Sequence, residues 1–315
     1  MPGAVVIVNP TKFDDLAQVR REVEAAARAA GHEAPTIVET TKDDPGFGQT
    51  REALRGRPDL VCALGGDGTV RAVAQVLAGT GVPLGLLPGG TGNLLARNLG
   101  TPVDDLAEAV SVALSGRDRR IDAGWLLLDP TEEQLAAPDP AAQRPDNAHL
   151  FTVMAGLGFD AAMVDDASEG LKDKVGWAAY IVAATKNLGA DGFAATVSVD
   201  GASGDPATAR TVVVGNCGTL TGGLVLLPDA VIDDGLLDIA TLTPQSLAAW
   251  AGVAANVLGN KTDDGPSIER KQGRDILVRV DPEQRVEVDG DVLDPGTRLR
   301  LVVDPGALVV RVSRR

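Results

Sequence analysis

Two glycine-rich turns constrain the fold of this chain more than any other feature, because each stands between a short apolar run and a segment of helical spacing. The first turn, Gly65 to Thr69 (GGDGT), follows the run 60–64, and the second, Gly89 to Asn93 (GGTGN), follows the run 83–87. Both runs have the length of a buried strand, and apolar residues recur at helical spacing after each turn. Strand, glycine turn and helix in this order are typical of a parallel α/β sheet.

Turns of this kind favour anion binding. Glycines let a ligand approach the backbone closely, and the helix that follows points unpaired N–H groups at that ligand. Two adjacent parallel strands would place both turns at the carboxyl edge of one sheet, where ligands of open α/β sheets bind. Asp67 repels a phosphate, so the first turn also implies a divalent cation or a bridging water beside it.

The first 125 residues alternate strand and helix signals and predict a doubly wound parallel sheet. Strands are expected at 4–8, 36–38, 60–64, 83–87 and 119–128, and helices at 13–30, 50–54, 70–77, 93–99 and 104–114. The stretch 129–147 is rich in proline, alanine and acidic residues without periodicity, so we expect a long loop or insertion there, near a domain boundary.

The second half of the chain predicts a largely antiparallel β domain. Short strand-like runs separated by turn residues occur at 193–200, 211–214, 236–242, 275–280, 285–288, 298–302 and 308–312. Helical signals remain at 161–188 and 246–258. The predicted architecture is an α/β domain at 1–125 and a β-sandwich domain at 126–315, and the sequence leaves open whether the last strands, near 303–315, return to the first domain.

Composition excludes several classes of function. A net charge of −15 argues against nucleic-acid binding, which requires a basic surface. Two cysteines in apolar surroundings, Cys62 and Cys217, offer neither a disulfide framework nor a zinc site. With no leader and no apolar run of membrane-spanning length, we expect a cytoplasmic protein. Docking on a lipid surface would need a local patch, for which the candidates are the lysines flanking 175–188, Lys172, Lys174 and Lys186. Such a segment is more often a buried helix or a subunit contact than a surface that binds lipid.

The sequence GGDGTV at 65–70, followed by PGGTGN at 88–93, resembles the catalytic domain of the diacylglycerol kinase and sphingosine kinase family. The resemblance extends through Asn9-Pro10 and through 120–122, 158–161, 233–235 and 289–291. It implies a nucleotide domain, a β-sandwich domain and an active site in the cleft between them. It also implies an ATP-dependent lipid kinase that acts at a membrane surface, with diacylglycerol first among the acceptors, and homodimers are common among such proteins.

The resemblance also implies roles for individual residues. The nucleotide would be held by short polar side chains and by the first glycine turn: Asn9, Pro10, Thr41, Gly65, Gly66, Asp67, Gly68, Thr69, Val70 and Thr91. The carboxylates expected around Mg²⁺, directly or through water, are Asp67, Asp122 and Asp234. A structural magnesium in the second domain would take the Asp234 carboxylate and the main-chain oxygens of Val231 and Leu236, although Asp-Asp-Gly at 233–235 could equally be a hairpin turn.

Residues 286–293 alternate around a central Asp-Gly and predict a tight hairpin. A primary alcohol is a poor nucleophile, so a carboxylate should accept its proton during phosphoryl transfer. Asp291 occupies the matching position, where the family usually has glutamate. Two further departures are Leu94, where close relatives often have an acidic residue, and Thr11-Lys12-Phe13, which replaces the Ser-Gly that often follows Asn-Pro.

Two other functions stay open. One is a small-molecule kinase resembling NAD kinase, although that family's Asn-x-Gly-x-x-Gly-Phe-Leu signature is missing here. The other is a nucleotide-binding regulatory protein without turnover, for which the departures at Leu94 and Asp291 speak. A P-loop NTPase is excluded because the chain contains no Gly-Lys dipeptide.

Overall fold

The computed structural model describes residues 3–138, 145–158, 192–219, 225–259 and 265–314. The described residues form two compact units, the first within 1–123 and 306–315 and the second within 124–305. The chain passes between the units twice, within β5 (Arg117–Leu128) and within β16 (Gly296–Val312). The helix expected at 161–188, with Lys172, Lys174 and Lys186, lies outside the described residues.

A parallel sheet forms the centre of the first unit, in the strand order β2-β1-β3-β4. Val310 of β16 pairs in parallel with Leu84 of β4, so the end of the chain belongs to this unit, a point that the sequence left open. The strands are β1 (Ala4–Val8), β2 (Thr36–Glu39), β3 (Leu60–Gly65) and β4 (Leu84–Pro88). The doubly wound α/β architecture is confirmed.

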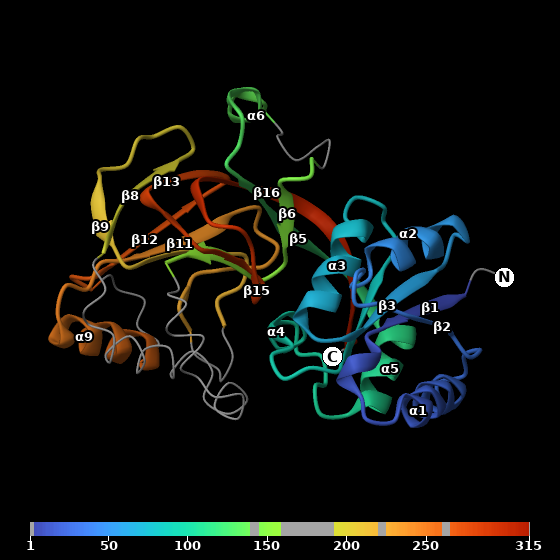
Figure 1. Cartoon of the computed structure of the whole chain (residues 1–315). Helices are drawn as coiled ribbons and strands as arrows, with labels where there is room; N and C mark the ends of the chain where they lie inside the picture. The colour runs from blue at the N-terminus through green and yellow to red at the C-terminus, as the bar shows by residue number, and fades with distance from the viewer. Residues whose placement is uncertain (1–2, 139–144, 159–191, 220–224, 260–264, 315) are drawn as a thin grey trace. The chain divides into compact units, whose positions relative to one another are not determined.

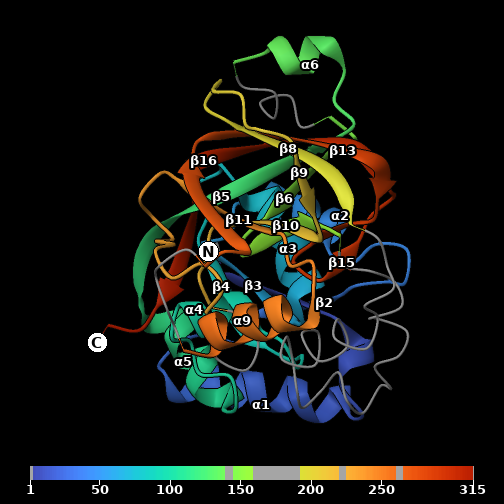
Figure 2. The same cartoon turned by 90° about the vertical axis from the view of Figure 1, so that its left-hand side faces the viewer.

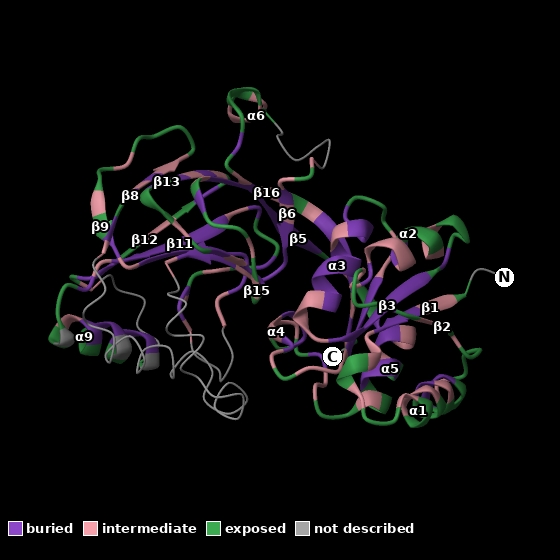
Figure 3. Ribbon diagram, viewed as in Figure 1, coloured by how far each residue is buried: buried purple, intermediate pink, exposed green. Residues whose placement is uncertain are grey.

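Helices cover both faces of this sheet, and Figure 1 shows α1 and α5 on one side and α2 and α3 on the other. The two faces alternate along each strand: Val6 and Val8 pack toward α1 and α5, whereas Ile7 points to the side of α3. Every residue of β3 is buried, as expected of a central parallel strand (Figure 3). The helices are α1 (Leu16–Ala29), α2 (Phe47–Arg55), α3 (Asp67–Leu77), α4 (Leu94–Asn98) and α5 (Leu106–Ser115).

The second unit is a β-sandwich, as the sequence predicts. One sheet has the order β12-β11-β10-β7-β14-β15, and the other contains β16, β13, β8 and β9, with β5 and β6 joined to it through β16. Alternate residues from both sheets form one hydrophobic core, which includes Phe151, Val214 and Leu301. The further strands are β6 (Ala148–Phe151), β7 (Met154–Leu157), β8 (Phe193–Val199), β9 (Ala207–Ala209), β10 (Thr211–Gly215), β11 (Leu237–Leu242), β12 (Ile268–Gly273), β13 (Asp275–Gln284), β14 (Val286–Val288) and β15 (Asp291–Val292).

A single described helix, α9 (Leu247–Leu258), covers the outer face of the six-stranded sheet (Figure 2). Its side chains Trp250, Val253 and Val257 pack with Val213 and Ala240 in a second apolar cluster. Within the described ranges, no helix combines the length and the apolarity needed to cross a bilayer.

Two details of local structure differ from the expectations. The stretch 129–147, expected as a loop, contains α6 (Glu132–Ala136), whose start is fixed by a reciprocal capping box between Thr131 and Gln134. The strands expected at 298–302 and 308–312 are parts of one continuous strand, β16. Four strands of the sandwich, β6, β7, β9 and β12, were not predicted, because their short runs lack clear alternation.

A buried arginine holds α6 to the sandwich, although α6 stands apart from the strands in both views (Figures 1 and 2). Arg300 is 6% exposed and binds the Asp275 carboxylate through Nε at 3.0 Å and Nη2 at 2.6 Å. Its Nη1 donates to main-chain carbonyls at the end of α6: Gln134, Leu135 and Ala137. A cation beside the last carbonyls of a helix is favourable.

We predict that Arg300→Met lowers the free energy of unfolding by about 3 kcal/mol, because it leaves Asp275 and several partly buried carbonyls without their donor. Arg298→Met is the matched control on the same strand, since Arg298 also binds the α6 segment, through the exposed Glu132. That variant should lose less than about 1 kcal/mol. Urea unfolding measures both, and equal losses would contradict the role given to Arg300.

Candidate functional site

The two glycine turns lie against each other at the carboxyl edge of the parallel sheet, as predicted. The strands before them pair in register up to Gly65 and Pro88, and the Gly89 amide donates to the Gly65 carbonyl at 2.9 Å. One residue further, a Cβ atom on Gly90 would lie only 2.7 Å from the Gly66 Cα. The backbones of the two turns therefore touch, and together they form one continuous surface.

Asp67 fixes the second turn from the first. Its two carboxylate oxygens accept the amides of Asn93 at 2.9 Å and Leu94 at 2.7 Å, at the start of α4. Asn93 adopts a left-handed conformation, with φ of 48°, and its side chain bonds both the amide and the carbonyl of Gly90. Asp67 thus has a structural task that the sequence did not suggest, and its expected link to a metal stays a prediction.

A third segment follows the end of β1. The Asn9 amide donates to the Leu64 carbonyl at 2.9 Å, and the Asn9 side chain accepts bonds from the amide and hydroxyl of Thr11. Pro10 begins the 3₁₀ turn η1 (Pro10–Lys12). A Cβ atom on Gly89 would lie 2.5 Å from Cζ of Phe13, so the Phe13 ring packs directly on the second turn. The expected contacts Asn9 and Pro10 therefore lie beside the joined glycine turns.

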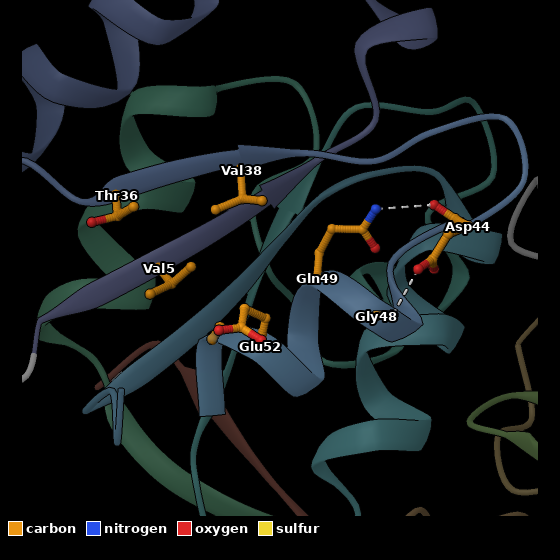
Figure 4. A pocket seen from close by; sticks show the side chains of 8 residues that line it. Val5, Thr36, Val38, Asp44, Gly48, Gln49 and Glu52 are labelled. Carbon is orange, nitrogen blue, oxygen red and sulfur yellow. Dashed lines mark hydrogen bonds between the residues drawn. The ribbon is translucent and has the colours of Figure 1, made fainter. Parts of the chain in front are cut away.

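Thr41 lies in a closed loop after β2, and the residue that organises this loop is Asp44. The Thr41 amide donates to the Asp44 carbonyl at 3.0 Å, and the Asp44 carboxylate accepts the amides of Gly46 and Gly48 at 3.1 and 2.9 Å. Figure 4 shows the Gly48 bond beside a mostly apolar groove of about 410 Å³. The groove contains no predicted site residue. A signal in the sequence could have identified Asp44, because it precedes Pro-Gly at the start of a helix, where aspartates often accept main-chain amides.

The other residues expected in the first unit differ in exposure. Thr69 and Val70 are buried in the first turn of α3, and a Cβ atom on Gly65 would lie 2.7 Å from the Thr69 hydroxyl. Thr91 is exposed at the tip of the second turn. Asp122 is only 3% exposed, and its carboxylate accepts the Gly306 amide at 2.7 Å, where β16 enters the unit. Asp122 therefore stabilises a backbone crossing, and its place near a metal stays a prediction.

The expected magnesium loop belongs to the second unit. The Asp234 carboxylate accepts the Leu236 amide at 3.0 Å, Gly235 has φ of 76°, and Val231 is 47% exposed. The described residues contain no group of three or more His, Cys, Asp or Glu side chains able to hold a metal. The expected site has only one carboxylate, so it would not be found as a group of this kind. Its other donors are main-chain oxygens, and oxygen donors are those that Mg²⁺ prefers. The exposed turn therefore fits a magnesium that retains several waters.

The predicted hairpin is confirmed: β14 and β15 pair with Val288 opposite Asp291, and Asp289 and Gly290 have φ of 47° and 88°. The buried Asp289 carboxylate accepts the Thr152 hydroxyl and the amides of 152–154, at 2.7–3.0 Å. Burial raises the pKa of Asp289, and these donors oppose the rise. Asp289 anchors the hairpin, whereas Asp291 is partly exposed.

Glu287 is a residue of this hairpin that the sequence did not single out. Val286 and Val288 point into the sandwich core, so alternation places Glu287 on the opposite face of β14. Burial raises the pKa of Glu287 to about 7, and the negative charges of Asp291 and Asp289 add to this rise. The hairpin thus carries, besides Asp289 and Asp291, the Glu287 carboxyl group, whose pKa is raised to about 7.

Comparison with known proteins relates both units to one family. The model of the diacylglycerol kinase catalytic domain matches residues 3–126, and that of the YegS C-terminal NAD kinase β-sandwich-like domain matches residues 152–312. A probable lipid kinase YegS-like of Pseudomonas aeruginosa is 33% identical, over 94% of this chain and 89% of that protein. A diacylglycerol kinase of Bacillus subtilis is 29% identical, over 92% and 90%.

Solved structures share the fold. A crystal structure of a putative diacylglycerol kinase from Bacillus anthracis aligns with a TM-score of 0.78 at 21% identity, covering 99% of this chain and 95% of that chain. An NAD kinase from Archaeoglobus fulgidus aligns with a TM-score of 0.50 at 15% identity, covering 100% and 94%.

Two glycine substitutions should separate packing from ligand access. Gly90→Ala places a methyl group against the Gly66 backbone, so we predict a loss of about 1–3 kcal/mol in the free energy of unfolding. Gly66→Ala meets no atom closer than 3.7 Å. It should lose less than about 1 kcal/mol, yet weaken ATP binding at least about tenfold by blocking close approach to the backbone. Thermal unfolding and calorimetry measure the two effects, and unchanged ATP affinity in Gly66→Ala would contradict this site.

Glu287→Gln should change how stability depends on pH. The pKa of Glu287 is about 7 in the folded chain, against a reference value of 4.5, so its contribution to stability is present below pH 4.5 and lost as the pH rises to about 7. The unfolding free energy of Glu287→Gln relative to the parent chain should therefore rise by about 2 kcal/mol between pH 4.5 and 7.5. Urea unfolding across this range measures it. Glu283→Gln, at an exposed position of β13, should show no such trend.

Proposed function

Because the chain belongs to the diacylglycerol kinase catalytic-domain family of lipid kinases, we propose that it transfers the γ-phosphoryl group of ATP to a lipid hydroxyl, in a reaction that requires Mg²⁺. Diacylglycerol is the first candidate for the acceptor. The observation that carries this proposal is the joined pair of glycine turns at the carboxyl edge of the parallel sheet.

The names of the relatives support the choice of acceptor. The Bacillus subtilis relative, which this chain matches along nearly its whole length, is a diacylglycerol kinase. A Mycobacterium tuberculosis protein, 32% identical over 75% of this chain and 72% of that protein, carries the same name. The YegS-like relatives are named only as probable lipid kinases, so ceramide, sphingosine and prenols are the acceptors to compare with diacylglycerol.

On the donor side, the triphosphate would bind along the joined glycine turns. Main-chain amides of Gly65 to Val70 can approach phosphate oxygens closely, and the start of α3 adds a favourable dipole. Asn9, Thr41 and Thr91 would contribute short polar side chains, which can bond the nucleotide without blocking these backbone contacts. Asp67 would keep the second turn in place while the triphosphate is bound.

On the acceptor side, Asp291 would accept the proton of the lipid hydroxyl as the phosphoryl group is transferred. The oxygen–hydrogen bond of the alcohol breaks, the proton moves to the carboxylate, and the alcohol oxygen forms the new bond to phosphorus while ADP leaves. Asp291 lies next to a rigid turn, because Asp289 fixes the hairpin through the backbone of 152–154. An aspartate held in this way can serve as base even though it is one methylene shorter than glutamate.

Magnesium would be bound in the second unit by the Asp234 carboxylate and the main-chain oxygens of Val231 and Leu236. When bound, Mg²⁺ would also neutralise part of the charge of the transferred phosphoryl group. The carboxylates of Asp67 and Asp122 would contact Mg²⁺ directly or through water. We further propose that the protein binds lipid surfaces transiently, and that it forms homodimers.

The direct test measures phosphate transfer from ATP with Mg²⁺ to diacylglycerol, ceramide, sphingosine and prenols in detergent micelles. We predict transfer to diacylglycerol, at least about a hundredfold less in Asp291→Asn because the base is lost, and activity retained or raised in Asp291→Glu. Asp294→Asn, an exposed position just after the same hairpin, is the matched control and should keep the parent rate.

Three outcomes would contradict the proposal in different ways. Transfer to NAD in water without detergent would favour a small-molecule kinase like NAD kinase. ATP binding with every acceptor unmodified would favour a regulatory protein without turnover. Full activity in Asp291→Asn would leave lipid kinase activity intact and remove Asp291 as its base.

A further inference from the structure

Lys12 is held in a fixed position beside the joined glycine turns. It is the last residue of η1, a turn that begins with the Asn9 cap and closes with a bond from the Phe13 amide to the Pro10 carbonyl. The next residue, Phe13, packs on Gly89. The backbone on both sides of Lys12 is therefore anchored to the ends of β1 and β4.

The Lys12 side chain extends over the seam between the two turns. Its Cε lies 3.8 Å from the point that a Cβ atom of Gly66 would occupy, and the Gly90 Cα lies 3.7 Å from that same point. The ammonium group is one bond beyond Cε. The methylene groups of Lys12 thus border the space left free by Gly66, and the positive charge lies at the edge of that space.

The ammonium of Lys12 forms no salt bridge with any residue that the structure describes. The residue is exposed, in a chain with 44 acidic and 29 basic side chains. By contrast, Arg20 of the first unit pairs with Glu39, and Arg311 pairs with Asp118. Lys12 therefore leaves its charge available beside the two glycine turns.

We infer that Lys12 binds the terminal phosphates of the nucleotide, in a segment that lacks the Ser-Gly of many relatives. An ammonium on a long stem is a compact charge that suits a phosphate, and such a charge-assisted hydrogen bond is stronger than a neutral one. This inference rests on the proposed function, because that function brings a triphosphate to the turns. The positive charge of Lys12 offsets part of the negative charge of the triphosphate.

Calorimetry on the full chain tests this role with three probes: ATP, inorganic tripolyphosphate and adenosine. Lys12→Met should weaken binding of ATP and tripolyphosphate by about tenfold to a hundredfold and leave adenosine binding unchanged. Lys12→Arg, which keeps the charge, should retain most of the affinity. Lys271→Met removes the same charge from β12, where Lys271 pairs with Glu269, and should bind all three probes like the parent chain.

The outcomes separate this inference from the proposed function. If the parent chain binds ATP and Lys12→Met binds it within about twofold, the inference is wrong and the kinase proposal stands. An equal loss for adenosine and ATP in Lys12→Met would also overturn it, because that result indicates a distorted turn instead of a lost phosphate contact. If the parent chain binds neither ATP nor tripolyphosphate, the proposed function itself fails.

Discussion

The hydrogen bond from the Gly89 amide to the Gly65 carbonyl extends the pairing of β3 and β4 one residue past the end of β4. Parallel pairing fixes the register of the two turns, and a glycine at position 90 allows the next step, in which the Gly66 and Gly90 backbones touch. Asp67 then ties the start of α4 to the start of α3 through two main-chain amides. Each of these contacts depends on the previous one, so the shape of the candidate site follows from the pairing of two central strands.

Several aspartate carboxylates of this protein bind main-chain amides. Asp67, Asp122 and Asp289 each accept main-chain amides, and each lies at a point where two segments that are distant in sequence must be held together. Asp44 does the same within one loop. Amide donors stabilise a carboxylate that is removed from water, which makes such a group suitable for fixing a turn. Asp291 lies partly exposed on the hairpin that Asp289 anchors, whereas Asp122 and Asp289 are buried.

The features that were predicted from the sequence are those marked by a repeated motif or by alternating apolar and polar residues. The parallel sheet, the contact of the two glycine turns and the hairpin at Asp289 and Gly290 were all predicted from short local motifs. The helix α6 was missed because five residues give no periodicity, although Thr131 and Gln134 spell a capping box. The main-chain partners of Asp67 and Asp122, and the partners of Arg300, which include the Asp275 carboxylate, could not be predicted, since only the fold brings these groups together. Glu287 was missed because its elevated pKa arises mainly from burial.

Amide hydrogen exchange of the full chain, with and without ATP and Mg²⁺, tests most directly whether the joined turns bind the triphosphate. The account predicts that the nucleotide slows exchange in both segments, at 65–70 and at 89–94, because main-chain amides of the turns donate to phosphate oxygens or are shielded by them. Bound nucleotide that leaves exchange in both turns unchanged would contradict it.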